Sequence, residues 1–464
     1  MSTMGRALRI VVLALLVSVS PGLVSPAPVW AASGDKLWFT TWDGALHQID
    51  VSRDIAVDPA GTRVFVTGYS TVAEGGYGGW ATIAYSASTG KQLWVALVAT
   101  PNYSNFAWAI AVAPDGSNVY VTGIVKGSAT TCEIGTVAYD AATGAALWAR
   151  VYAGAGPTYG CQPPVNVLVS PGSNRVYVAT PTLESTLNGE TFTILAYSST
   201  GRRLWVAHSP PDVEVDKLTG AAIAPDGSKI FLTGQGGLPN SGLDFLTMAF
   251  GTRHGALQWM TYYSTPDADY PSAIAVTPDS SRLYVVGIRD TVAALVAYDS
   301  GSGAEQWRTE YHDHRFAQAI STSPDGSKVF MVASGDPYSG WMTRAVSSGG
   351  QTLWERTYSN RTGDVTETPY AVGSRPDGSA IYVTGLVSSW DWSYRWATVK
   401  YRVSDGTQLW ARMIDGRSRY GPISGDALAI PPAGDRVFVT GQSADGTTAD
   451  TSGYIDYGTV AYAA

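Results

Sequence analysis

The sequence contains few charged residues, few histidines and very few cysteines. Of its 464 residues, 15% are charged, five are histidine and two are cysteine, and the formal net charge is −8. A chain with this negative charge is not expected to bind nucleic acid or an anionic membrane. No nucleophile elbow (Gly-x-Ser-x-Gly), glycine-rich phosphate loop or His-Glu-x-x-His zinc motif is recognisable. The sequence alone therefore identifies no catalytic residue.

Long hydrophobic runs are also missing, except for one short stretch at the N-terminus. Ile10 to Val19 follow two arginines and are too few to span a bilayer. Val29-Trp30-Ala31 fits a small-x-small cleavage site, and no cysteine for a lipid anchor lies nearby. We expect residues 1–31 to be a signal peptide cleaved after Ala31. Residues 32–464 are then a single secreted, extracellular domain without a membrane span.

The sequence is rich in glycine, tyrosine and tryptophan, and these residues recur in a repeated unit. One copy runs from Ala109 to Tyr152 and contains four short apolar segments typical of β-strands. A Pro-Asp-Gly-Ser turn joins the first strand to the second, and a Thr-Gly turn joins the third to the fourth. The unit therefore predicts a four-stranded antiparallel sheet.

Eight copies of the unit can be counted. The proline of the first turn falls at Pro59, Pro114, Pro171, Pro225, Pro278, Pro324, Pro376 and Pro432. Glycine followed four residues later by tryptophan occurs in the first seven copies, and the eighth such pair is Gly34 and Trp38, near the N-terminus. We predict an all-β, eight-bladed β-propeller of four-stranded antiparallel blades, whose last blade is closed by the N-terminal strand.

The repeat resembles that of a known family. The segment from Asp140 to Trp148 resembles the tryptophan-docking motif of pyrroloquinoline quinone (PQQ) dehydrogenase propellers, which also have eight blades. The Pro-Asp-Gly-Ser-x-Val-Tyr-Val-Thr-Gly half is similar to repeats of many secreted bacterial propellers. This PQQ-like resemblance covers roughly residues 33–464 and implies the fold, but not one activity, because propellers host unrelated functions.

The loops divide into two kinds, which predicts that the two faces of the propeller differ. The short, uniform turns share one face, so the long, variable loops share the other, and function tends to lie on such loops. We expect a binding surface there, at the mouth of the central channel, although the same side chains would also serve simply to cover the blade ends. The candidates are Arg53, Trp108, Gln318, Tyr370 and Asp426, just before first strands, and Trp390, Trp392 and Tyr394 in one loop.

Two further groups of residues are expected on the variable face. Cys132 and Cys161 are predicted to form a disulfide, with two buried reduced thiols as the alternative. His312 and His314, with Asp267 and Asp269 nearby, are weak metal-ligand candidates that lack a third converging ligand, so we predict no metal site. Asp445, Asp450 and Asp456 lack the alternation of a calcium-binding EF-hand loop and are expected to be solvated.

Three functions remain open. The first is a non-catalytic, monomeric propeller without a cofactor that binds a protein, glycan or cell-wall partner; the repeats resemble those of the lipid-anchored assembly-scaffold propeller of bacterial outer membranes. The family resemblance implies a second, a quinoprotein dehydrogenase using PQQ and calcium. Many members of that family stack the quinone under a disulfide of adjacent cysteines, whereas Cys132 and Cys161 are not adjacent. The third is a propeller hydrolase or lyase with loop-borne carboxylates.

Overall fold

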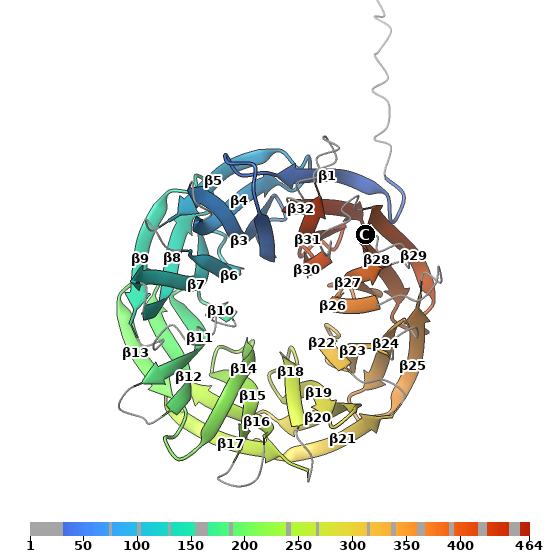
Figure 1. Cartoon of the computed structure of the whole chain (residues 1–464). Helices are drawn as coiled ribbons and strands as arrows, with labels where there is room; N and C mark the ends of the chain where they lie inside the picture. Colours follow the sequence, from blue (N-terminus) through green and yellow to red (C-terminus); the bar gives the residue numbers. More distant parts are fainter. Residues whose placement is uncertain are drawn as a thin grey trace, which may run out of the picture.

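Eight four-stranded sheets surround a central axis in the structure, which is a computed structural model (Figure 1). The residues that it describes are 31–73, 77–99, 104–128, 131–153, 166–184, 189–237, 243–265, 269–312, 316–335, 340–359, 367–388, 394–415, 425–444 and 455–464. Within them, no helix is long and apolar enough to cross a membrane. The signal peptide predicted for residues 1–31 falls almost wholly outside this part of the chain and stays a prediction.

The first four blades follow one another along the chain. Blade 1 contains β2 (Asp50–Val57), β3 (Arg63–Ala73), β4 (Tyr77–Ser86) and β5 (Gln92–Val98). Blade 2 contains β6 (Phe106–Val112), β7 (Asn118–Ser128), β8 (Thr131–Asp140) and β9 (Ala146–Tyr152). Blade 3 contains β10 (Asn166–Val169), β11 (Arg175–Glu184), β12 (Gly189–Ser198) and β13 (Arg203–His208). Blade 4 contains β14 (Glu214–Ile223), β15 (Lys229–Gly237), β16 (Asp244–Gly251) and β17 (Leu257–Tyr263).

The last four blades complete the circle. Blade 5 contains β18 (Asp269–Val276), β19 (Arg282–Arg289), β20 (Val292–Asp299) and β21 (Glu305–Tyr311). Blade 6 contains β22 (Phe316–Thr322), β23 (Lys328–Ser334), β24 (Trp341–Ser347) and β25 (Thr352–Tyr358). Blade 7 contains β26 (Glu367–Ser374), β27 (Ala380–Ser388), β28 (Tyr394–Arg402) and β29 (Gln408–Asp415). Blade 8 contains β30 (Gly425–Ala429), β31 (Arg436–Ala444), β32 (Ile455–Ala463) and β1 (Lys36–Trp42).

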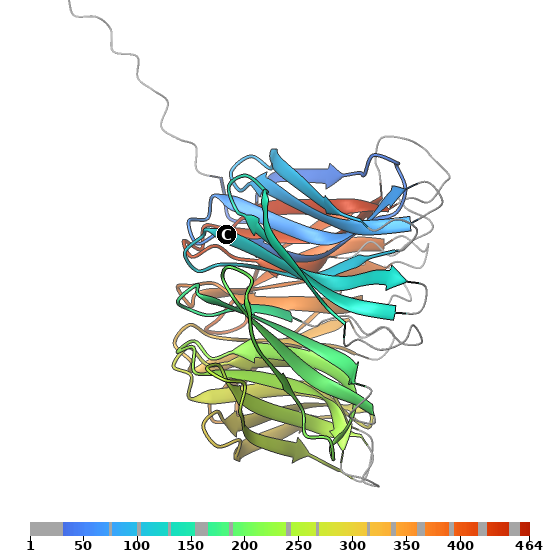
Figure 2. The ribbon, with the colours of Figure 1, turned by 90° about the vertical axis from the view of Figure 1, so that its left-hand side faces the viewer.

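The first strand of every blade lies next to the axis and the fourth lies at the rim (Figure 1). Neighbouring strands are antiparallel throughout. Figure 2, seen from the side, shows the short turns within blades gathered on one face of the disc. This arrangement confirms the predicted eight-bladed fold.

The N-terminal strand closes the ring, as predicted. β1 pairs antiparallel with β32, with Trp38 opposite Ala461 and Phe39 opposite Val460. The backbone N–H of Gly34 also donates to the Ala463 carbonyl at 2.7 Å. Closure protects sheet edges that would otherwise be open to aggregation.

The repeated tryptophan joins each blade to the next. Trp94 of blade 1 donates its indole N–H to the Ala141 carbonyl of blade 2 at 3.2 Å, and Trp148 donates to the Ser199 carbonyl of blade 3 at 2.8 Å. The indole covers the glycine of the next Thr-Gly turn: a Cβ on Gly144 would lie 2.6 Å from the Trp94 ring. The prediction that this tryptophan packs between blades is confirmed.

The remaining aromatic repeat positions form the core. Trp80, Trp341 and Trp396, predicted to share one core position, are at most 1% exposed. The indole N–H of Trp80 reaches the next blade and donates to the Ile124 carbonyl at 3.1 Å. The core is therefore a ring of interblade clusters around an open axis rather than a single central mass.

Candidate functional site

The first strand of a blade has a β-bulge near its start, beside the channel, wherever that start lies among the described residues. In seven blades, the pairing of the first strand with the second skips one residue at a shared position. The residues skipped there are Arg53, Trp108, Thr219, Ser272, Gln318, Tyr370 and Asp426, and β14 of blade 4 skips Asp216 as well. In blade 3 the equivalent position lies outside the described residues. A bulge aims an extra side chain away from the regular ladder, so each blade can present one side chain to the channel.

A glycine of the repeat makes room for the bulge. A Cβ on Gly123 in β7 would lie 2.1 Å from the Phe106 carbonyl oxygen and 2.7 Å from Ala107 Cα. The bulged strand therefore approaches β7 too closely for any side chain there. The same close approach occurs at Gly68, Gly234, Gly287 and Gly385, whereas blade 6 has Ala333 at this position. The Val-Thr-Gly segment of the repeat thus helps to build the site.

The most varied bulge residues are consecutive around the ring. Blades 7, 8, 1 and 2 present Tyr370, Asp426, Arg53 and Trp108, in that order, and we call this set the bulge arc. The Arg53 guanidinium carbon lies 4.9 Å from the centre of the Trp108 ring, a cation–π contact. Burial raises the pKa of Tyr370, and the negative charge of Asp426 raises it further. A carboxylate and a guanidinium thus occupy neighbouring blades, and the blades on either side carry aromatic residues.

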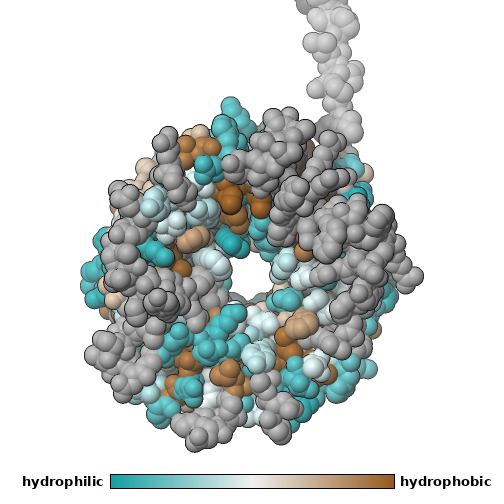
Figure 3. Space-filling model, viewed as in Figure 1, coloured by the Kyte–Doolittle hydropathy of each residue, from teal (hydrophilic) through white to brown (hydrophobic). Residues whose placement is uncertain are grey.

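The bulge arc remains accessible although it lies on the innermost strands. Arg53 is exposed, Trp108 and Asp426 are half-buried, and Tyr370 is 38% exposed. Figure 3 shows the open channel bordered by residues of mixed hydropathy. The sequence placed these residues just before the first strands, and the structure places them within those strands. Their role as ligand-binding residues stays a prediction.

A half-buried acceptor beside the bulge links neighbouring blades. The Asp54 carboxylate follows the bulge of β2 and accepts a hydrogen bond from the Ile110 backbone N–H of blade 2 at 2.9 Å. The side chain of Asn166 does the same for the Ala221 N–H of blade 4 at 3.0 Å. Burial raises the pKa of Asp54 to about 6, against the opposing effect of its backbone hydrogen bonds. Blades 1 and 2 are thereby held together directly behind Arg53 and Trp108.

Several sequence candidates cannot be placed. Trp390, Trp392, Cys161 and His314 lie outside the described residues, and so does the side chain of Tyr394. The disulfide between Cys132 and Cys161 therefore stays a prediction. His312 is exposed at the end of a rim strand, and the buried Asp269 receives hydrogen bonds from Thr265. The structure therefore does not test whether these residues converge on a metal.

An acidic cluster was missed by sequence reasoning. Asp43, Asp50 and Asp456 each offer a carboxylate oxygen, and these oxygens lie within 4.8 Å of one another. Asp456 was expected to be solvated, but this is wrong: it is only 3% exposed because it lies inside β32, facing blade 1. The sequence gives little signal for the cluster, because its members come from opposite ends of the chain.

The comparison with protein families identifies the chain. The model described as outer membrane protein assembly factor BamB matches residues 27–259 and, in an overlapping second match, residues 190–452. The chain belongs to this family. It is a BamB-like propeller built of PQQ-type repeats, as the resemblance in the sequence implied. A search of curated proteins finds no match.

Solved structures agree on the fold. BamB from Moraxella catarrhalis is 15% identical, with a TM-score of 0.50 over 92% of this chain and 99% of that one. The C-terminal WD40 domain of Sif2 is 12% identical, with a TM-score of 0.57 over 93% and 100%. Sqt1 from Chaetomium thermophilum is 10% identical, with a TM-score of 0.57 over 93% and 99%. At these identities the likeness concerns the fold alone.

The described residues do not fit the quinone-stacking arrangement that the PQQ dehydrogenase resemblance implied. Cys132 lies in β8, the third strand of its blade, and is 2% exposed. It belongs to the hydrophobic cluster between blades 2 and 3, which also contains Ile134 and Val176. Cys132 thus belongs to the core between two blades. We therefore describe this BamB-like chain as a propeller scaffold.

Proposed function

We propose that this protein is an exported, non-catalytic scaffold that binds a partner protein through the channel mouth of its variable face. The observation that carries the proposal is the bulge arc: four consecutive blades present Tyr370, Asp426, Arg53 and Trp108 on one edge of the channel. The family model supports a protein partner, because it is described as a protein assembly factor.

The composition of the bulge arc suits protein recognition. Binding energy at interfaces is concentrated in a few tryptophan, tyrosine and arginine side chains. Arg53 and Trp108 already contact each other before any partner arrives, so less side-chain entropy is lost on binding. The hydrogen bond from Ile110 to Asp54 fixes the two bulges relative to each other. A partner would therefore meet a preorganised surface.

A glycan or cell-wall polymer is the second candidate ligand. Tyr370 and Trp108 have partly exposed rings that can stack on a sugar. We favour the protein, because the arc also has adjacent charges of both signs, which give orientation to a protein interface. The described residues of this surface include no arrangement that would favour a quinoprotein dehydrogenase, hydrolase or lyase.

Partner capture from a cell-envelope extract tests the proposal. We expect the secreted chain to retain a defined protein, and the double variant Arg53→Ala with Trp108→Ala to reduce that retention at least about tenfold, the loss of one hot spot. Lys91→Ala is the matched charge control, because Lys91 is exposed on the opposite, short-turn face. It should bind like the parent.

Two results would contradict the proposal. The first is equal retention by the double variant while its circular dichroism and melting temperature show that it is folded. The second is binding to purified cell-wall glycan in place of protein, with the same loss in the double variant. That result would keep the site and change the ligand.

A further inference from the structure

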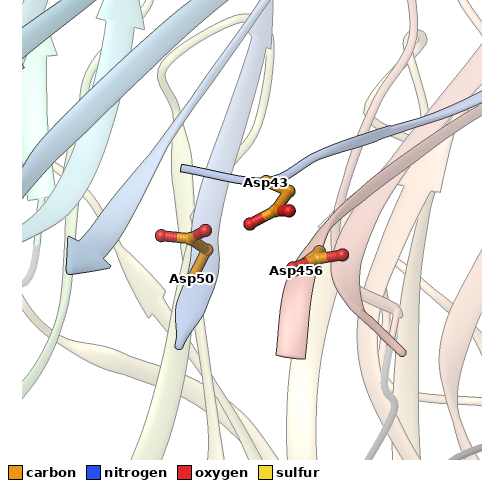
Figure 4. Close-up of side chains that lie close together, drawn as sticks. All are labelled: Asp43, Asp50 and Asp456. Atoms are coloured by element: carbon orange, nitrogen blue, oxygen red, sulfur yellow. The ribbon is translucent and has the colours of Figure 1, made fainter. Parts of the chain in front are cut away.

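The acidic cluster lies where the two ends of the chain meet. Asp43 follows β1 in the connection that leads from blade 8 to blade 1, Asp50 begins β2 of blade 1, and Asp456 lies in β32 of blade 8 (Figure 4). Asp50 is 1% exposed and Asp456 is 3% exposed. Carboxylates buried this close to one another repel strongly unless a proton or a cation neutralises them.

The contacts of Asp50 satisfy only half of its carboxylate. Its Oδ2 accepts the backbone N–H of Gly44 at 2.6 Å. Its Oδ1 is buried without a hydrogen-bond partner among the described residues, and so is Oδ1 of Asp43. The other oxygen of Asp43 contacts the exposed His47 ring. Two oxygen atoms of the cluster are therefore left for a ligand.

A third oxygen atom, outside the acidic set, also lacks a partner among the described residues. Ser70 lies opposite Asp50 in the β2–β3 pair and is 1% exposed. Its hydroxyl lies next to the Asp50 carboxylate but makes no hydrogen bond of acceptable geometry in the described part of the chain. A Cβ on Gly44 would lie 2.8 Å from this hydroxyl and 3.1 Å from each Asp50 oxygen. Position 44 therefore has no room for a side chain beside the Ser70 hydroxyl and the Asp50 carboxylate.

In blade 5, the carboxylate at the position equivalent to Asp50 has hydrogen bonds to both of its oxygen atoms. Asp269 begins β18 as Asp50 begins β2, and its Oδ2 accepts the backbone N–H of Thr265 at 3.0 Å, as Asp50 accepts that of Gly44. The Thr265 hydroxyl then donates to the other oxygen, Oδ1, at 3.1 Å. Gly44 has no hydroxyl to offer. Asp50 Oδ1 therefore lacks the bond that Thr265 provides to Asp269.

We infer that Asp43, Asp50 and Asp456, with the Ser70 hydroxyl, form a binding site for a calcium ion. Calcium takes six to eight oxygen ligands at about 2.3–2.6 Å, so two ligands on opposite sides lie about 5 Å apart. The separations of up to 4.8 Å in the cluster match that size. All four groups are hard oxygen donors, which suit calcium better than zinc or copper. Water would complete the coordination.

The ion would stabilise the closure of the ring. Asp43 is carried by the N-terminal strand and Asp456 by the C-terminal strand that pairs with it. One cation between them and Asp50 would tie both strands of blade 8 to blade 1. The inference does not depend on the identity of the partner protein, because it concerns stability and not recognition.

Thermal unfolding of the full secreted chain, with calcium or with a chelator, tests the site. At a calcium concentration one hundred times Kd, we expect the melting temperature to rise by about 3 °C. Asp50→Asn should abolish the rise. Asp269→Asn is the matched control and should keep it. Magnesium at equal concentration should give a smaller rise, because it tolerates irregular sites poorly.

Terbium luminescence provides a second, direct readout. Terbium is a calcium mimic that is sensitised by nearby aromatic rings, and Trp42 and Tyr457 adjoin two of the ligands, with ring centres 5.2 Å apart. We expect luminescence from the parent chain, competed by calcium, and its loss in Asp43→Asn, a partly exposed position that should not affect folding. An unchanged melting temperature at about 10 mM calcium, a shift retained in Asp50→Asn, or luminescence that calcium does not displace would each overturn the inference.

Discussion

The indole N–H of Trp410 donates a hydrogen bond to the Ser33 hydroxyl at 3.1 Å, across 377 residues of sequence. In the other blades, the same indole typically reaches a backbone carbonyl of the following blade, as Trp354 reaches Val403 at 2.8 Å. Ser33 thus stands where the next blade's turn would be. The junction between blades 7 and 8 is therefore held by an equivalent contact, with a hydroxyl in place of the carbonyl.

Deletion of residues 33–42 should therefore destabilise the protein severely. It removes β1, the buried Trp38 and the acceptor of Trp410. Loss of the Trp38 side chain alone should cost about 3–5 kcal/mol. Denaturant unfolding of a chain starting at Ala32 provides the reference. If the deleted chain unfolds at the same denaturant concentration, the closure does not stabilise the ring.

The glycine beneath each indole should tolerate alanine far less than a glycine of the Pro-Asp-Gly-Ser turn. Gly144 and Gly116 both have φ of 73°, so both substitutions cost about 1 kcal/mol in backbone strain. A Cβ on Gly144 would meet the Trp94 ring at 2.6 Å, whereas a Cβ on Gly116 would meet Pro59 at 3.5 Å. We expect Gly144→Ala to cost about 1–3 kcal/mol more than Gly116→Ala. Equal unfolding free energies would show that the indole moves aside.

Two tryptophans at the same repeat position should respond differently to phenylalanine. Trp148 donates to the Ser199 carbonyl at 2.8 Å, whereas the buried indole N–H of Trp205 has no hydrogen-bond partner among the described residues. Trp148→Phe removes a bond and leaves a carbonyl unpaired, while Trp205→Phe removes only an unsatisfied donor. We expect Trp148→Phe to be more destabilising by about 1–3 kcal/mol. Chemical denaturation of both variants measures this difference.

Replacement of Asp54 by asparagine should stabilise the protein near neutral pH. The folded-state pKa of Asp54 is raised to about 6 by burial, against about 3.9 in the unfolded chain. Between about pH 4 and 6, Asp54 is therefore protonated more fully in the folded protein than in the unfolded chain. The stability that this protonation contributes at low pH is lost as the pH rises from about 4 to 6. Asparagine can still accept the Ile110 N–H, as Asn166 accepts that of Ala221.

The size and pH dependence of that gain provide the check. Asp54 is only half-buried. We therefore expect Asp54→Asn to raise the free energy of unfolding by about 1 kcal/mol at pH 7.5, and to leave it unchanged below about pH 4. Asp50 and Asp269 also have pKa values raised to about 6, mainly by burial. Only the difference between parent and variant therefore isolates Asp54. A gain that is the same at pH 4 and 7.5 would contradict the charge argument.

Repetition made the fold predictable, and loss of repetition limited the prediction of the site. Eight prolines and eight Gly-x-x-x-Trp pairs fixed the number of blades and the closure, because each blade follows the same local rules. The shared position of Arg53, Trp108, Gln318, Tyr370 and Asp426 was visible, but their bulges were not, because a register shift depends on the paired strand. The acidic cluster could not be found, since it unites residues of both chain ends.

The bulges separate recognition from folding. At Trp108 and four equivalent positions the bulged strand lies against a glycine of the neighbouring strand, and blade 6 has the same bulge with Ala333 there, so the bulge forms with different residues at the skipped position. Substitutions at these positions, one per blade, can therefore alter binding specificity without changing the fold. A combinatorial library confined to the bulge positions should yield well-folded proteins with new binding preferences.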